Sequence, residues 1–508
     1  MPKHPLSRLL VFCAILFGAL VRLYPVWVAG FPVNDGGMFH RMVQDLVASG
    51  FRLPLYTTYN QLNIPFAYPP LPFYLAGFLH QVLNIPLIEI IRWSPALMSI
   101  LTIPAFFWLA RILLSDENKA VVATLFFAFM PRSFEWLIMG GGLTRAPATL
   151  FFLFFAGSLI KVFRDQERKS ILYAVLSGGA VLLSHPERSL HALTMGILFF
   201  VLFARTKRGL IDALMIGAGV ALVSTPWWAV SLVRFGLEPI LQASRAGGDR
   251  ALFWSPLLLL NFTDETIAIT ALLGVIGIMY ELANRRWLLP VWALMPFLAD
   301  PRSAPHIAPI QFSLLAGVAL VDVVLPALIR KSDTDGRLNS KAGKLVITYV
   351  LILGLVNGLL NAFTLSGIRL STHEREALTW ISQNVPSSGH TFLIYPGESD
   401  AALSPLLEWF PALTSQTSLS TYQGREWLTG QQHSDAFFES REKWLACGSR
   451  DEQCLEDWMS SSGEAVEYVL ISLDAQYNTA NLSRSLKTSS GFELLYQNDE
   501  VEIFQRTR

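Results

Sequence analysis

Charged side chains are scarce in this sequence. Lys, Arg, Asp and Glu make up 15% of the 508 residues, whereas an ordinary soluble protein carries about 25%. Acidic and basic residues balance at 39 each, so the chain lacks the positive excess that binds nucleic acid. Because hydrophobic residues reach 52%, the composition predicts a membrane protein with long apolar spans.

Cysteine is also scarce, with three residues in the chain. Cys13 lies in the first apolar run and is expected to be a small core residue. Cys447 and Cys454 stand close together in a polar stretch, and a disulfide between them fits an oxidising compartment. Two free or metal-binding thiols are the alternative, although no further Cys or His stands at zinc spacing.

Apolar runs dominate residues 1–366, which we expect to form a multi-span membrane domain. About eleven of them approach the length of a span, roughly 20 residues. They lie at about 9–29, 91–112, 119–139, 146–163, 171–184, 189–204, 209–233, 264–282, 286–299, 306–329 and 345–366. The first follows a short basic start and no cleavage site follows it, which indicates a retained first span or signal anchor.

Short basic connections orient these runs, because Lys and Arg favour cytoplasmic loops. The connections lie at 3–8, 111–119, 161–169, 205–208, 285–286 and 330–344. If all are cytoplasmic, about eleven helices alternate without a break. The chain is then a multi-pass protein of the cell membrane, with its amino terminus in the cytoplasm and its carboxy terminus outside.

The apolar stretch 69–88 does not fit this alternation. It is short and rich in proline, and as a full span it would move every later basic connection to the outside. We therefore expect an interfacial or re-entrant element within a first external loop at about 31–90, buried against protein. A count of about twelve spans is the alternative.

The composition changes after residue 366. Residues 371–397 read as a helix, a turn and a strand, 434–447 as a helix, 467–474 as a buried strand, and 491–506 as a hairpin. Residues 367–508 are therefore expected to form a small extracytoplasmic α/β domain.

Four loops with unusual polar content fall on the same outer face in this topology. They are residues 33–42, 139–147, 184–191 and 299–306. The orientation was derived from the basic connections and not from these four loops. That all four fall on one side is therefore a partly independent observation. Polar groups gathered at one membrane face suggest a single site.

Asp35 is the first candidate in these loops. Apolar residues between 38 and 47 recur at helical spacing, with His40 on the opposite side, which predicts an amphipathic helix along the membrane surface. Asn34 or Asp35 would suit the N-cap of that helix. A carboxylate aimed by a helix start could equally be a catalytic base or a metal ligand, and the two roles are compatible.

Two arginines are candidate phosphate ligands. Arg145 follows the glycines 140–142 at a helix start, where backbone amides and a guanidinium can hold an anion. A tight turn with Arg145 reaching the interface is the alternative. Arg302 stands at the outer end of a later span as a second candidate.

A metal site and a sugar-stacking surface are further candidates. His185 and Glu187 begin a helix, and together with Asp35 they could bind a divalent ion such as Mg or Mn; a capped interfacial turn is the alternative. Trp409, in a Glu-Trp-Phe run, could stack on a sugar or lie in an interfacial aromatic belt.

These features together resemble the GT-C superfamily of integral-membrane glycosyltransferases, which includes oligosaccharyltransferase catalytic subunits, protein O-mannosyltransferases and aminoarabinose transferases. The resemblance rests on Asp35 after the first span, the surface helix, the Tyr68-Pro69-Pro70-Leu71 run and the α/β region after the last span. It covers about residues 9–366. Its implications are an external active site, a sugar donor carried on a polyprenyl phosphate or diphosphate, and Asp35 as base or metal ligand.

The resemblance also implies inversion at the anomeric carbon, and it makes Tyr68, with His40, a candidate for substrate contact. The chain departs from the oligosaccharyltransferases, because Gly-Gly-Gly-Leu-Thr-Arg replaces their acidic pair and their WWDYG signature is absent. A different acceptor, which could be a protein, a glycan or a lipid, is therefore expected.

Two other functions remain as alternatives. One is a transporter or flippase of lipid-linked precursors, and the other is a non-catalytic membrane scaffold. Transporters keep their polar sites near the bilayer midplane, whereas the polar residues here stand at the ends of the apolar runs. This placement favours the transferase.

Overall fold

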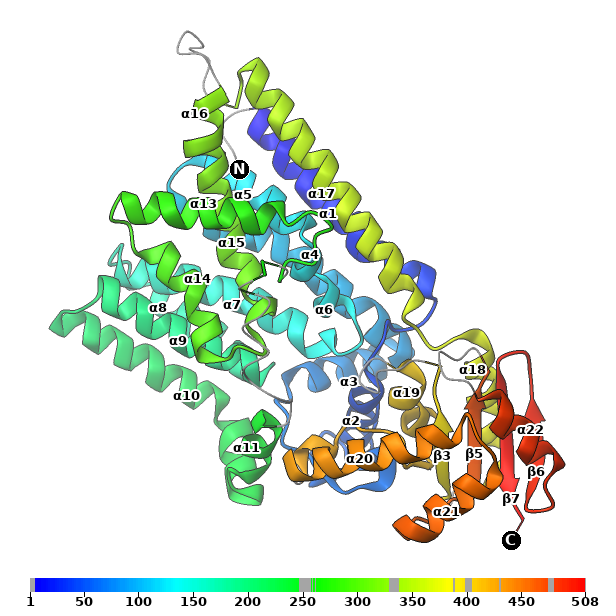
Figure 1. Ribbon diagram of the computed structural model, residues 1–508. Helices are drawn as coiled ribbons and strands as arrows, with labels where there is room; N and C mark the ends of the chain where they lie inside the picture. Colours follow the sequence, from blue (N-terminus) through cyan, green and yellow to red (C-terminus); the bar gives the residue numbers. More distant parts are fainter. Residues whose placement is uncertain are drawn as a thin grey trace.

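The structure is a computed structural model of the chain. It describes residues 5–245, 257, 259–260, 262–328, 338–386, 389–397, 404–428, 431–473 and 479–507. A bundle of long helices forms most of the molecule, and a smaller unit with a β-sheet lies at one end of the bundle (Figure 1).

Each of the predicted apolar runs contains a helix. The helices are α1 (Pro5–Ala29), α4 (Leu87–Leu114), α5 (Glu117–Phe129) with α6 (Glu135–Ile138), α7 (Gly142–Phe163), α8 (Ser170–Leu182), α9 (Pro186–Phe203), α10 (Lys207–Phe235), α13 (Ile269–Ala283), α14 (Leu288–Ala299), α15 (Ala308–Ala319) with α16 (Leu325–Leu328), and α17 (Lys341–Gly367). A short α11 (Glu238–Arg245) follows α10.

The helices establish a multi-pass membrane protein. Within the described part of the chain, 6 helices are long and apolar enough to cross a membrane, and a bent pair, α5 with α6, makes up to 7. The predicted number of about eleven is larger because it also includes α9, which is not among these helices, and α8, α13 and α14, which are apolar but short.

Helix α5 ends at Phe129, two residues before Pro131, and the chain bends by 88° into α6. Arg22 of α1, fully buried, stabilises this bend by donating to the carbonyl of Ala128 at 2.7 Å and to Ser133 Oγ at 3.3 Å. A helix end leaves carbonyls without partners, and a buried guanidinium can satisfy them. The bend directs α6 and the following glycines toward the loop after α1.

The first loop contains α2 (Gly37–Ala48), β1 (Tyr56–Thr57), the 3-10 turn η1 (Tyr59–Gln61), β2 (Ile64–Pro65) and α3 (Leu71–Leu83). With 13 residues, α3 is about 20 Å long, shorter than the roughly 30 Å of a bilayer core. Helix α2 is the predicted amphipathic helix, but its apolar face packs on α3 and α19 (Pro405–Thr414). Protein, and not lipid, therefore covers that face.

The C-terminal region contains a five-stranded sheet in the order β4-β3-β5-β7-β6. Its strands are β3 (Thr391–Tyr395), β4 (Thr417–Ser418), β5 (Tyr468–Ser472), β6 (Phe492–Gln497) and β7 (Val501–Arg506). Strand β3 pairs in parallel with β4 and β5, and β7 is antiparallel to β5 and β6. The helix, buried strand and hairpin expected from the sequence are all present.

The remaining elements of this region are helices. They are α18 (Thr372–Asn384), α19, the 3-10 turn η7 (Arg425–Trp427), α20 (Gln431–Cys447), α21 (Glu452–Ser462) and α22 (Ala480–Thr488). Cys447 and Cys454 form a disulfide that ties α20 to α21.

The C-terminal region is not separate from the first loop. One hydrophobic core contains Phe31, Met42 and Tyr59 of that loop together with Phe392 and Leu407 of the C-terminal region. In Figure 1, α19 accordingly lies beside α2. The core crosses the expected domain boundary at 366/367.

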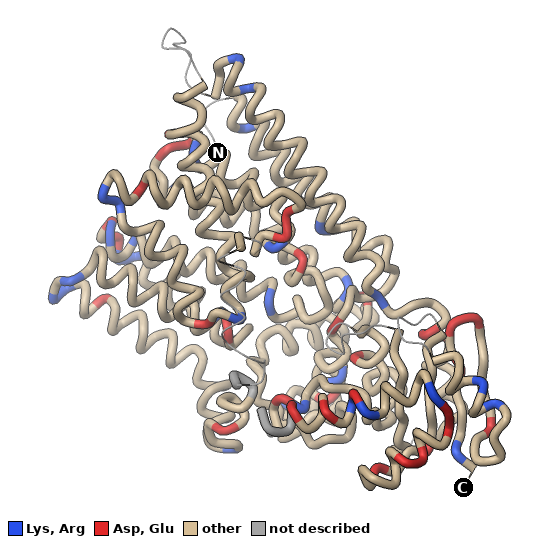
Figure 2. The backbone as a smooth tube through the Cα atoms, in the orientation of Figure 1, with Lys and Arg blue, Asp and Glu red and all other residues tan. Residues whose placement is uncertain are grey.

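Charged residues are unevenly placed along the bundle. Figure 2 shows Lys and Arg where α10 and α17 begin and between α13 and α14, at helix ends far from the sheet. The sheet region carries mixed charges, and the helices between carry scattered charges of both signs. Part of the predicted basic connection at 330–344 lies outside the described residues.

Candidate active site

Asp35 stands in the turn between α1 and α2 and faces the turn before α7. Its Oδ1 accepts a hydrogen bond from the backbone amide of Gly141 at 2.7 Å. Its Oδ2 forms an ion pair with the guanidinium of Arg145 at 2.9 Å. Both carboxylate oxygens are thus held by a chain segment more than 100 residues away.

The predicted cap of α2 is wrong. Gly36, with a φ of +119°, is the N-cap residue, and no side chain of the turn caps the helix. The amides of Gly36 and Met38 donate instead to Oε1 of Glu408 on α19, at 3.3 and 3.1 Å. Asp35 is not the cap because its carboxylate bonds to Gly141 and Arg145.

The glycines before α7 allow two backbones to touch. A Cβ at Gly140 would lie 1.8 Å from the carbonyl oxygen of Asp35, and one at Gly141 would lie 2.4 Å from its Oδ2. The Gly140 amide also donates to Val33 at 2.9 Å. The predicted amide-lined anion site therefore holds an anion of the protein itself, the Asp35 carboxylate.

Arg145 is positioned by aromatic and hydroxyl groups. Its guanidinium lies 5.0 Å from the centre of the Trp136 ring, a favourable distance for a cation on an aromatic face. The residue before Arg145, Thr144, has its hydroxyl 3.4 Å from the hydroxyl of Tyr68. Burial raises the pKa of Tyr68, so this phenol stays protonated.

A second ion pair connects the other two polar loops. Arg302, before α15, pairs with Oε1 of Glu187, at the start of α9, at 2.7 Å. Arg188 extends this contact, because its guanidinium donates to the carbonyl of His306 at 2.9 Å and to Thr149 of α7 at 3.2 Å.

The two ion pairs lie within electrostatic reach of each other. The charges of Asp35 and Glu187 both act on Tyr68 and on Arg145. The ring of Tyr68 lies 6.0 Å from that of His185, next to the second pair. The structure therefore brings five predicted residues into one cluster, and Arg302 joins it as a sixth through Glu187. The five are Asp35, Tyr68, Arg145, His185 and Glu187.

The predicted metal site is not formed. Among the residues that the structure describes, no group of three or more His, Cys, Asp or Glu could hold a metal ion. Asp35 and Glu187 are each engaged by an arginine, so their oxygens are poor candidates for ligation. The arrangement of Asp35, His185 and Glu187 does not fit a divalent Mg or Mn ion.

Two residues predicted to contact substrate, Trp409 and His40, are buried in the protein. Trp409 is 0% exposed, and its indole donates to the carbonyl of Asn34 at 3.0 Å. It packs against Phe31 and His40, so no sugar can stack on it. Burial lowers the pKa of His40 to about 4, which leaves a neutral, buried ring that does not bind phosphate.

Three charged residues near the cluster were not predicted as site residues: Arg188, Glu408 and Glu426. Glu426 lies in η7, within electrostatic reach of Arg302, and burial raises its pKa to about 7. The next residue, Trp427, packs against Tyr68 with ring centres 5.7 Å apart. Glu-Trp pairs at 408–409 and 426–427 are visible in the sequence, but no spacing connects them with Asp35.

Solved structures of two glycosyltransferases resemble this chain. No protein-family model and no curated protein sequence matches it. The arabinofuranosyltransferase AftD from Mycobacteria aligns over 97% of this chain with a TM-score of 0.59 and 15% identity. This chain spans 40% of the length of AftD.

The second neighbour is ArnT from Cupriavidus metallidurans. Bound to undecaprenyl phosphate, it aligns over 96% of this chain and 97% of its own length, with a TM-score of 0.54 and 14% identity. Its apo form gives a TM-score of 0.55. Both neighbours are GT-C membrane glycosyltransferases, and the chain therefore has the fold of the superfamily that its sequence resembles.

Proposed function

We propose that the protein is a glycosyltransferase that moves a sugar from a polyprenyl-phosphate-linked donor to an acceptor hydroxyl outside the membrane. The observation that carries the proposal is the placement of Asp35. In a chain with the GT-C fold, this carboxylate lies between a backbone amide and Arg145, beside Tyr68 and the pair of Glu187 with Arg302.

The cluster contains the groups that the transfer requires. The acceptor hydroxyl attacks the anomeric carbon and gives its proton to Asp35, a contribution of about 10²–10⁴-fold to the rate. The bond from the anomeric carbon to the phosphate oxygen breaks, and polyprenyl phosphate leaves with the electron pair. Arg145 and Arg302 stabilise its negative charge. Attack opposite the leaving phosphate inverts the anomeric carbon.

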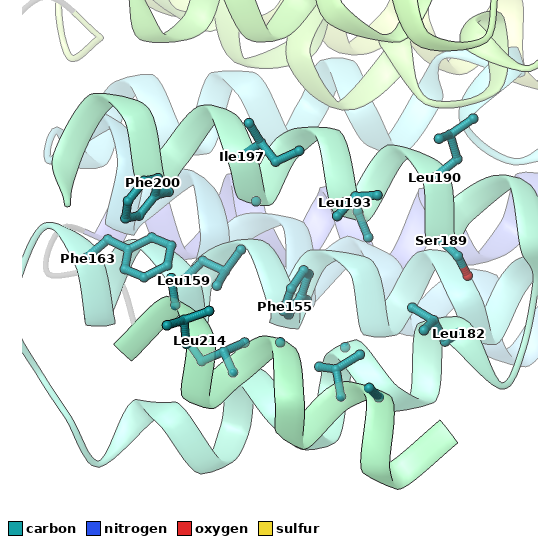
Figure 3. Close-up of a pocket in the computed structure, with 18 of the residues that line it drawn as sticks. Phe155, Leu159, Phe163, Leu182, Ser189, Leu190, Leu193, Ile197, Phe200 and Leu214 are labelled. Carbon is teal, nitrogen blue, oxygen red and sulfur yellow. The ribbon is translucent and has the colours of Figure 1, made fainter. Parts of the chain in front are cut away.

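An apolar cavity supports a lipid-linked donor. It has a volume of about 590 Å³ and lies between α7, α8, α9 and α10. Figure 3 shows Leu193, Ile197 and Phe200 of α9 along it, with Ser189 at one end. Ser189 follows Arg188 directly in α9, so this end of the cavity is the one nearer to the cluster along the helix.

The charge distribution supports an outer location for the site. The cluster adjoins the C-terminal region, because Gly36, next to Asp35, bonds to Glu408 of α19, and Figure 2 shows Lys and Arg at helix ends far from the sheet. Since Lys and Arg favour cytoplasmic loops, the cluster and the C-terminal region would lie outside the cell membrane, with the amino terminus in the cytoplasm.

The test uses the full chain in lipid nanodiscs, with undecaprenyl phosphate as the binding probe in native mass spectrometry. Replacing Arg145 with Gln should weaken binding about tenfold or more, as expected for a lost hydrogen bond to a charged group. Arg208→Gln is the matched control, because Arg208 begins α10 at the far end of the bundle. Equal binding by the Arg145 and Arg208 variants would contradict the assigned phosphate site.

Turnover distinguishes transfer from transport. Labelled polyprenyl-phosphate sugars, first an arabinofuranosyl donor and then hexosyl donors, are supplied to proteoliposomes with membrane glycans as acceptors. The proposal expects release of polyprenyl phosphate together with labelled product. Movement of intact donor across the bilayer without cleavage would contradict it and favour a flippase.

A further inference from the structure

Glu408 connects the C-terminal region to the turn that carries Asp35. One oxygen of its carboxylate accepts hydrogen bonds from the amides of Gly36 and Met38, at 3.3 and 3.1 Å. These are free donors at the start of α2, and in most helices a nearby Ser, Thr, Asn or Asp satisfies them. Here the acceptor comes from 370 residues further along the chain.

Three more contacts fix the same place. The Trp409 indole donates to the carbonyl of Asn34 at 3.0 Å, and the Tyr59 hydroxyl donates to the carbonyl of Glu408 at 2.7 Å. A Cβ at Gly37 would lie 2.2 Å from that same carbonyl oxygen, so the two backbones are in direct contact. Residues on both sides of Asp35 are therefore held by α19.

The environment of Glu408 favours its neutral form. The residue is 8% exposed. Burial raises its pKa to about 8, and the negative charge of Asp35 adds to the rise. A protonated carboxyl still has an acceptor oxygen for the two amides, and it adds little repulsion to Asp35.

We propose that Glu408 is a positioning residue for Asp35, and that α19 of the C-terminal region is thereby a working part of the active site. This inference rests on the proposed role of Asp35 as the base. Without the Glu408 oxygen, the amides of Gly36 and Met38 lose their partner and the first turn of α2 loosens. A displacement of the base by about 1 Å can lower a rate about 10²-fold.

Hydrogen exchange of the full chain in nanodiscs tests the contact without any substrate. In Glu408→Ala, the amides of Gly36 and Met38 should exchange about tenfold faster, the effect expected for a lost cap. Glu408→Gln keeps an acceptor oxygen and should exchange like the wild type. Glu376→Ala, at a largely exposed acid of α18, is the matched control and should leave these amides unchanged.

The activity assay separates positioning from general damage. Glu408→Ala should lower kcat with little change in KM for the donor, and Glu408→Gln should restore kcat. If Glu408→Ala does not fold, Glu408→Asp, which withdraws the carboxyl by one methylene, replaces it and should give a smaller change in the same direction.

The outcomes distinguish this inference from the proposed function. Unchanged exchange at Gly36 and Met38 in the Ala or Asp variant overturns the positioning role, whatever the activity. Equal losses of kcat in the Ala and Gln variants also overturn it. A third outcome combines two observations: Glu408→Ala exchanges faster, and the wild type cleaves no polyprenyl-phosphate sugar. This outcome supports the contact and rejects the transferase.

Discussion

Replacing Asp35 with Asn is the most direct test of the site. Asparagine keeps the shape of the side chain and an oxygen for the Gly141 amide, which lies 2.7 Å from Oδ1. It removes the proton acceptor and the charge that pairs with Arg145. The transfer rate should therefore fall about 10²–10⁴-fold, the usual contribution of a general base.

The same substitution leaves Arg145 without its ionic partner. Breaking a fully buried pair costs about 3–5 kcal/mol. The side chains of Asp35 and Arg145 are 17% and 22% exposed, and Trp136 still contacts the guanidinium, so we expect a loss of about 1–2 kcal/mol after solvent screening. Such a variant remains folded, and the larger rate loss is then chemical.

The assay compares initial rates of donor cleavage in nanodiscs with thermal unfolding of the same samples. Asp45→Asn is the matched control: Asp45 is an acid within α2, and its carboxylate accepts hydrogen bonds from Thr57 Oγ1 at 2.7 Å and from the Thr58 amide at 2.8 Å. It should lose stability and keep its rate. The base assignment fails if Asp35→Asn stays within tenfold of wild type, or if both variants lose activity equally.

Three further predictions follow from other contacts. Arg302→Gln should raise the KM for the donor about tenfold, with partial recovery in Arg302→Lys, because a charge near Glu187 remains; an unchanged KM would remove Arg302 from the phosphate site. Burial raises the pKa of Glu408 from 4.5 to about 8, so the folded chain keeps a proton that the unfolded chain loses. That part of the stability is complete below pH 4.5 and is lost as pH rises through about 8; thermal unfolding of Glu408→Gln should lack this decline, and a parallel decline in both proteins would contradict it. Cys447→Ser should lower the unfolding free energy by about 2 kcal/mol, and a reductant should destabilise the wild type alone; equal sensitivity to reductant would contradict this.

The sequence predicted the composition of the cluster well. The basic connections alone placed Asp35, Arg145, Glu187 and Arg302 on one side, and the structure gathers these residues through two ion pairs. The prediction used the expectation that helix ends alternate between two faces, so that basic connections assign a side to each loop; the number of spans and the orientation stay predictions. The roles of these residues stay predictions.

Contacts between distant segments could not be predicted. The expected cap at Asn34 or Asp35 was wrong, because local rules could not anticipate an acceptor supplied by Glu408. Trp409 was expected at a surface, yet it is buried under the turn that it holds. Periodicity reports which face of an element is apolar, but it does not report which distant segment covers that face.

Arg22 has a consequence for how the chain is made. It lies in the first apolar helix, where a central arginine opposes insertion by about 2.5–3.5 kcal/mol. Its partners Ser99, Ala128 and Ser133 leave the ribosome long after it does. The carbonyl of Gly18 in the same helix accepts one hydrogen bond at 2.9 Å, so the first helix enters the bilayer with the other donors of this side chain unsatisfied, or waits beside the translocon, until α4 and α5 have been synthesised and can close around it.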